Sequence, residues 1–166
     1  MAERYLVLFD VDDLLVTVNE NGERSRTSGS WEAISQITGR TDAVQSVLTT
    51  LPKAEAQAKV GDVTGVGLVR YFDVEVGAYG EDSADRGELV KLALRRAQDS
   101  YGGEFTVAAV VLGTVDEVTK VRDAADIVVA VASDESSVDE LRAAGAGLVV
   151  TRLNDVVQLV LGTHVG

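Results

Sequence analysis

An apolar run that ends in acidic residues is the feature that most constrains the fold of this 166-residue chain. Residues 5–9 read YLVLF, Asp10 follows directly, and Asp12 comes two residues later. A continuous run of this length, rich in β-branched and aromatic residues, is typical of a strand buried on both faces of a sheet. Open α/β sheets bind ligands beyond the carboxyl ends of their strands, so both carboxylates occupy the usual place of a site. A solvated acidic loop is the alternative interpretation.

Composition favours one domain over residues 1–166 and argues against negatively charged macromolecules or membranes as partners. Hydrophobic residues make up 46% of the chain, which suffices for one core. The formal net charge of −12 opposes binding to nucleic acid or to an anionic membrane surface. The absence of Cys excludes disulfides and thiol nucleophiles. The sequence shows neither a signal-peptide pattern nor an apolar run of membrane-spanning length, so we expect a cytoplasmic protein.

Apolar strands alternate with amphipathic helices, which predicts a three-layer α/β/α sandwich around a doubly wound, mostly parallel, Rossmann-like sheet. An Asn-Gly pair at residues 21–22 predicts a small β-hairpin. The expected strands span residues 5–9, 44–49, 74–78, 106–112, 127–132 and 147–150. The expected helices span residues 30–37, 52–60, 84–100, 115–124, 137–144 and 154–161.

The carboxyl ends of parallel strands lie at one edge of a sheet, so residues that follow different strands can meet there. Thr49 follows the second strand, Thr114 follows a later strand, and Arg86 lies in the first turn of the long helix. A cation in that turn opposes the helix dipole, so we expect Arg86 to have a role beyond helix stability. These three residues are expected to converge with Asp10 and Asp12.

The order of these features resembles the haloacid dehalogenase (HAD) superfamily, in its phosphoglycolate-phosphatase-like branch. LFDVDD resembles the first motif, DxDGT, which implies that Asp10 is a nucleophile forming an aspartyl-phosphate and Asp12 a general acid/base, both near Mg²⁺. VLTTLPKAEAQAK resembles the second motif, which implies that Thr49 holds a phosphoryl oxygen. YFDVEVGAYGEDSADR resembles the stretch before the third motif, where Arg86 replaces the usual Lys.

The fourth motif departs from the family pattern. VVLGTVDEV resembles a strand that leads into an acidic loop of the GDxxxD type, but the expected acids fall on Thr114 and Val118. Asp116 and Glu117 are nearby candidates for a metal ligand. The other interpretation is that these two acids only favour the positive end of a helix.

The first motif also departs, and the cap region is short. Asp13 and Leu14 stand where Gly and Thr are expected, and 38 residues separate Asp10 from Thr49. Capped relatives insert a helical domain in this interval. We therefore interpret residues 14–45 as a hairpin flap and a remnant of the cap, with no substantial cap domain. A site without its lid is open to water or covered by a neighbouring subunit, so a homo-oligomer is expected.

Two functional hypotheses stay open. One is a Mg²⁺-dependent phosphohydrolase that cleaves a phosphorylated small molecule through Asp10, with Thr49 and Arg86 binding the phosphate. The other is a catalytically degenerate relative with a binding, regulatory or assembly role. A receiver-type phosphoacceptor fits less well, because its phosphorylated Asp follows the third strand. His164 and the Gly-rich residues 61–67 indicate no further site.

Overall fold

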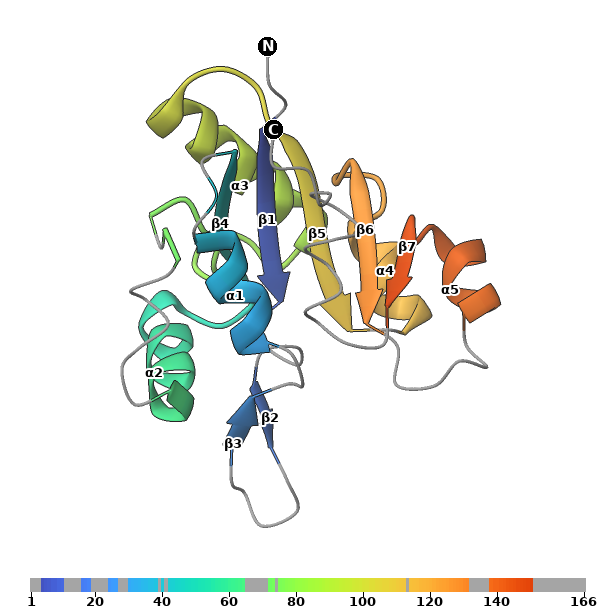
Figure 1. Cartoon of the computed structure of the whole chain (residues 1–166), viewed down its shortest axis with the longest axis horizontal. Coiled ribbons are helices and arrows are strands. Elements are labelled where there is room, and N and C mark those ends of the chain that lie inside the picture. Colours follow the sequence, from blue (N-terminus) through green and yellow to red (C-terminus); the bar gives the residue numbers. More distant parts are fainter. Residues whose placement is uncertain are drawn as a thin grey trace.

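A five-stranded parallel sheet forms the centre of the molecule, in the order β4-β1-β5-β6-β7 (Figure 1). The strands are β1 Tyr5–Asp10, β4 Ala43–Leu48, β5 Thr106–Leu112, β6 Ile127–Val131 and β7 Leu148–Val150. The structure is a computed structural model that describes residues 4–10, 16–18, 24–26, 30–38, 40, 42–64, 72–73, 75–112, 114–131 and 138–150. The predicted doubly wound parallel sheet is confirmed.

The first strand has neighbours on both sides. The chain passes from β1 to β4 at one side of the sheet and reaches β5 on the other side of β1. Asp10, the last residue of β1, pairs in register with Leu48, the last residue of β4. The strand order reverses at β1, and open α/β sheets form their ligand crevices at such a reversal. The fold therefore places Asp10 at the expected position of a binding site.

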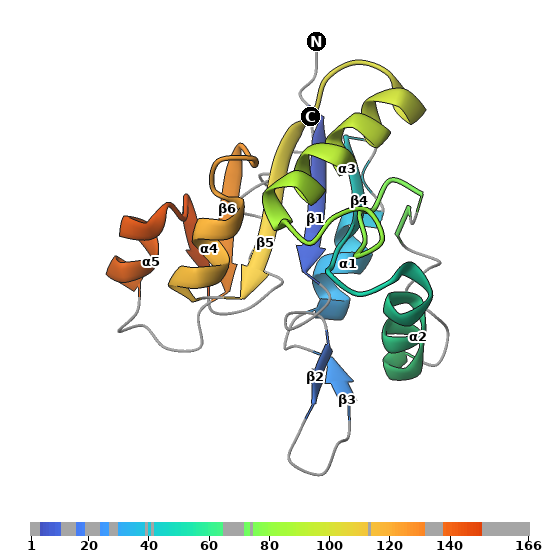
Figure 2. The ribbon, with the colours of Figure 1, turned by 180° about the vertical axis from the view of Figure 1, so that it is seen from behind.

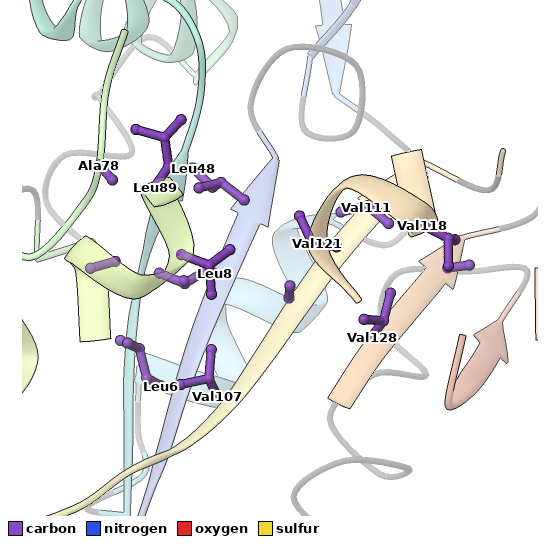
Figure 3. Packing of buried hydrophobic residues seen from close by; sticks show 14 of the residues in the cluster. Leu6, Leu8, Leu48, Ala78, Leu89, Val107, Val111, Val118, Val121 and Val128 are labelled. Atoms are coloured by element: carbon purple, nitrogen blue, oxygen red, sulfur yellow. The ribbon is translucent and has the colours of Figure 1, made fainter. Parts of the chain in front are cut away.

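Helices cover both faces of the sheet (Figures 1 and 2). One face carries α3 Arg86–Tyr101, α4 Val115–Val121 and α5 Val138–Ala144, and the other carries α1 Ser30–Thr38. Leu6 and Leu8 pack in the apolar cluster beneath α3 to α5 (Figure 3), whereas Val7 and Phe9 pack in the cluster on the α1 face. Both faces of β1 are buried, which explains why its apolar run does not alternate with polar residues.

A small antiparallel hairpin lies beyond the carboxyl end of β1 (Figure 1). It consists of β2 Val16–Val18 and β3 Arg24–Arg26, and helix α2 Lys53–Thr64 lies beside it. The predicted hairpin is confirmed, although its Asn-Gly turn lies outside the described residues.

The strand expected over residues 74–78 is wrong. Ala78 forms only an isolated parallel bridge with Leu48, and Glu75 lies in a turn. The side chain of Asp73 explains this difference, because its Oδ1 accepts a hydrogen bond from the backbone N–H of Glu75 at 3.2 Å. Such a local bond offers the backbone an alternative to a sheet ladder.

Several element ends also differ from the predicted ones. Helix α2 continues to Thr64 instead of ending near residue 60, and α4 ends at Val121 instead of residue 124. The helix expected at residues 154–161 lies outside the described residues. No helix in the described part of the chain combines the length and apolar character needed to cross a membrane.

Candidate functional site

Asp10 is fully buried at the carboxyl end of β1, with 0% of its surface exposed. Its Oδ2 accepts a hydrogen bond from Nη1 of Arg86, and the two side chains form an ion pair. A buried carboxylate is strongly disfavoured without a compensating charge, and a charge-assisted contact to a guanidinium supplies that charge. The structure thus holds Asp10 as one half of an internal ion pair.

The N-terminus of α3 delivers Arg86 to this position. Asp85 caps the helix, because its side chain accepts a hydrogen bond from the backbone N–H of Glu88 at 3.2 Å. Arg86 is therefore the first residue of α3, and it is 8% exposed. The unfavourable position of a cation in a first helical turn is explained by the ion pair with Asp10.

Glu117 contacts the other side of the Arg86 guanidinium. Nε of Arg86 lies 3.5 Å from Oε2 of Glu117, whose side chain is 12% exposed. Glu117 is held in the first turn of α4, where its backbone N–H donates to Oγ1 of Thr114 at 3.2 Å. Gly87 allows the two helices to approach, since a Cβ there would lie 3.3 Å from the backbone oxygen of Lys120. One guanidinium therefore lies between two carboxylates.

Thr49 is fully buried immediately after β4, next to the end of β1. Its backbone N–H donates to the backbone oxygen of Ala78 at 3.2 Å, and its Oγ1 accepts from the backbone N–H of Leu51 at 3.0 Å. These two bonds fix the chain where it leaves the sheet. Thr49 thus follows β4 at the same sheet edge as Asp10, as the sequence predicts.

The structure separates the two fourth-motif candidates. Asp116 has a side chain that is 76% exposed and pairs with Lys120 at 3.0 Å. Thr114 is an exposed helix cap, and Val118 is buried in the apolar core. Glu117 alone of the two acids approaches Arg86, and the Thr-x-x-Glu spacing of a capping box is the sequence signal that marks this position. Asp12 lies outside the described residues.

Oxygen donors at this edge are of the kind that Mg²⁺ prefers. Oε2 of Glu117 is buried and receives no hydrogen bond from the described groups, and the Arg86 guanidinium lies 3.5 Å from it. Within the described ranges, however, no three acidic or imidazole groups gather closely enough to hold a metal ion. The donor chemistry fits Mg²⁺, and a complete site would need Asp12 in addition to Asp10 and Glu117.

Lys120 is a site residue that sequence reasoning missed. Its Nζ lies 3.0 Å from Oδ2 of Asp116 and 3.5 Å from Oε1 of Glu117. The hydrogen bond to Asp116 is the main cause of the raised pKa of Lys120, so its ammonium stays charged. The available signal was the spacing of Lys120 at three and four residues after these acids, which brings the side chains together on one helix face.

An open cavity of about 510 Å³ adjoins this charged group. Its walls come from the residue after Thr49, from the start of α3 and from α4. The lining residues are Thr50, Ala84, Asp85, Arg86, Thr119 and Lys120. Arg86 lines this cavity and also forms the ion pair with Asp10. The cavity therefore lies next to the candidate nucleophile.

No protein-family model matches the chain, and no curated protein sequence matches it. Several solved structures, however, do match the chain. A candidate beta-phosphoglucomutase from Thermotoga maritima aligns with a TM-score of 0.74 at 14% identity, over 96% of this chain and 100% of that one. CbbY from Rhodobacter sphaeroides, solved in complex with phosphate, aligns with a TM-score of 0.69 at 14% identity, over 92% of this chain and 96% of that one. A haloacid dehalogenase-like family hydrolase from Streptococcus pneumoniae aligns with a TM-score of 0.65 at 9% identity, over 96% of this chain and 99% of that one. The chain therefore has the fold of the HAD superfamily.

Proposed function

We propose that this protein is a slow, Mg²⁺-dependent phosphohydrolase that acts on a phosphomonoester of a small molecule. The observation that carries the proposal is the ion pair between Asp10 and Arg86 at the carboxyl ends of the central strands. It gives a carboxylate at the position of the family's nucleophile a cation that could also bind a phosphoryl group. Among the solved structures with this fold, CbbY is one that was determined with phosphate.

In the proposed reaction a carboxylate oxygen of Asp10 attacks the phosphorus atom while the bond from phosphorus to the leaving oxygen breaks. Asp12 donates a proton to that leaving oxygen and later takes one from the water that cleaves the aspartyl-phosphate. Arg86 and Thr49 bind phosphoryl oxygens. A Mg²⁺ held by Asp10, Asp12 and Glu117 would offset the negative charge of the phosphoryl group.

The burial of Asp10 is the reason why we expect slow hydrolysis. The carboxylate is 0% exposed and paired with Arg86, so a substrate must displace this contact before attack is feasible. Breaking a buried pair is unfavourable unless new charge partners replace the old ones. The approach of substrate therefore adds a step to the reaction, and we expect a low turnover number.

The second candidate function is a catalytically degenerate relative that binds a ligand or a partner without turnover. The specific observation in its favour is that Thr114 caps a helix and Val118 lies in the core, where the family pattern expects two acids. This function predicts no hydrolysis at any concentration of divalent metal.

One assay separates the two functions. Purified protein is incubated with p-nitrophenyl phosphate in the presence of Mg²⁺, Mn²⁺ or EDTA, alongside Asp10→Asn and Asp123→Asn. Asp123 is an exposed carboxylate beyond α4 and is the matched control. We expect metal-dependent release of p-nitrophenol that Asp10→Asn abolishes and Asp123→Asn retains. Release at the rate of the buffer blank by folded wild-type protein, verified by circular dichroism, would establish the degenerate function instead.

A further inference from the structure

Residues 77–80 lie along the chain where it leaves β4, next to Thr49. The backbone oxygen of Ala78 accepts a hydrogen bond from the N–H of Thr49 at 3.2 Å. Two residues further on, the N–H of Gly80 donates to the backbone oxygen of Leu51 at 2.8 Å. The place of Thr49 at the sheet edge therefore depends on where residues 77–80 are held.

An ion pair between Arg96 of α3 and Asp82 holds these residues on both sides of Ala78. The guanidinium donates to both carboxylate oxygens of Asp82, at 3.1 and 2.9 Å. Nη1 of Arg96 also donates to the backbone oxygen of Gly77 at 2.6 Å. Oδ2 of Asp82 accepts from the backbone N–H of Tyr79 at 3.0 Å. One bidentate pair, which has a well-defined geometry, thus fixes the backbone before and after Ala78.

Side-chain packing gives residues 77–80 few contacts of their own. Gly77 and Gly80 have no side chain, and Ala78 has one methyl group. The small size is required, because a Cβ on Gly77 would lie 2.8 Å from Oγ of Ser46 and one on Gly80 would clash with the backbone of Thr50. Glycine also has the greatest backbone freedom to lose. Polar contacts from outside the segment are therefore needed to keep it in place.

We propose that Arg96 and Asp82 are positioning residues, which hold Thr49 through Ala78 in the geometry in which it binds a phosphoryl oxygen. The inference rests on the proposed phosphohydrolase function. Neither residue contacts the substrate in this proposal. Thr49 holds the phosphoryl group before and during the transfer, so a loosened Thr49 weakens both states equally. Such a change raises KM and leaves kcat unaltered.

Amide hydrogen exchange, followed by NMR, tests the positioning without any substrate. Arg96→Met keeps the aliphatic stem and removes the guanidinium. Arg95→Met removes the same charge from an exposed neighbouring position on α3 and is the matched control. The N–H of Thr49 should exchange about fivefold faster in Arg96→Met, as for the net loss of one hydrogen bond, and at the wild-type rate in Arg95→Met. The N–H of Val110, in the central strand β5, should exchange at the wild-type rate in both.

Steady-state hydrolysis of p-nitrophenyl phosphate in Mg²⁺ tests the consequence for the reaction. Arg96→Met and Asp82→Ala should each raise KM about fivefold and leave kcat within about twofold. Arg96→Lys keeps a cation that can reach one of the two acceptors, so its KM should lie between those of wild type and Arg96→Met. Arg95→Met should retain the wild-type KM.

Wild-type exchange at Thr49 in Arg96→Met would overturn the proposal. Equal acceleration at Thr49 and Val110 would also overturn it, because a general loss of stability would then explain the effect. In the active protein, a lower kcat at constant KM would contradict the assigned role. Failure of the phosphohydrolase proposal shows itself differently, as absence of turnover in wild type, and the exchange rates still decide whether the Arg96–Asp82 pair positions Thr49.

Discussion

Arg86 forms a buried ion pair with Asp10, although 76 positions separate the two residues in the sequence. The pair joins the end of the central strand to the start of α3, so it fixes how the helix lies over the sheet. It also determines the electrostatic state of the candidate nucleophile. The stability of the fold and the chemistry of the site therefore depend on the same contact.

Removal of Arg86 should destabilise the protein strongly. Arg86→Ala leaves the carboxylate of Asp10 buried without its cation, and breaking a buried pair in this way costs about 3–5 kcal/mol. Arg86→Lys keeps the charge and should lose less than half as much. Urea denaturation followed by circular dichroism measures both. A free energy of unfolding of Arg86→Ala close to that of wild type would contradict this role.

Glu117 and Asp116 offer a matched pair of neighbouring acids. Glu117→Gln removes a buried charge beside Arg86, whereas Asp116→Asn removes an exposed one beside Lys120. We expect Glu117→Gln to raise the Mg²⁺ concentration that gives half-maximal hydrolysis by about tenfold, as for loss of a charged metal ligand. Asp116→Asn should leave it within about twofold, since exposed pairs contribute little. The opposite order would show that the exposed acid is the ligand.

Gly80 should not tolerate a side chain. A Cβ there would lie 2.0 Å from the backbone oxygen of Thr50, so Gly80→Ala must displace the chain next to Thr49. We expect a loss of stability of about 1–3 kcal/mol, as for other overpacked sites. Gly147→Ala is the control, because its nearest neighbours lie at 3.8 Å. Thermal unfolding compares the two, and equal melting temperatures would count against the predicted clash.

Acid should weaken the fold partly through Asp82. The hydrogen bonds from Arg96 hold the pKa of Asp82 below its ordinary value of 3.8. The stabilisation is present above that ordinary value and is lost as the pH falls through the lower pKa of the folded state. Asp82→Asn should therefore flatten the decline of unfolding free energy below about pH 4. Asp99→Asn, at an exposed position on α3, should keep the wild-type decline; identical curves for both variants would refute the assignment.

The fold was largely predictable because its strands carry strong local signals. The run at residues 106–112 is apolar after its first residue, Thr106, and became β5 with the expected limits. The run at residues 74–78 reads VEVGA and includes a charged residue and a Gly, and there Ala78 forms only a bridge, while the side chain of Asp73 accepts a hydrogen bond from the N–H of Glu75. Hydrophobic patterning does not register such a hydrogen bond between near neighbours, nor the low strand propensity of the Gly in this run.

The candidate site was predictable in part. Asp10 and Arg86 do meet, and the unfavourable helix position of Arg86 was the signal. Which of Asp116 and Glu117 faces Arg86 depends on the rotation of the short helix α4 around its axis. A shift of one residue in the start of that helix would turn the other acid toward Arg86. Lys120 was missed because a helical Lys near two acids reads as an ordinary surface pair.

The central position of β1 has a consequence for the newly made chain. Tyr5 pairs with Thr106, so the strand leaves the ribosome about 100 residues before its second neighbour exists. At ordinary rates of synthesis this delay lasts about 5–20 s. During that time the apolar run of β1 lacks one of its two partners, and an unpaired apolar strand is prone to aggregate. Yield in rapid overexpression should therefore be limited by this segment, and slower synthesis or chaperone capacity should improve it.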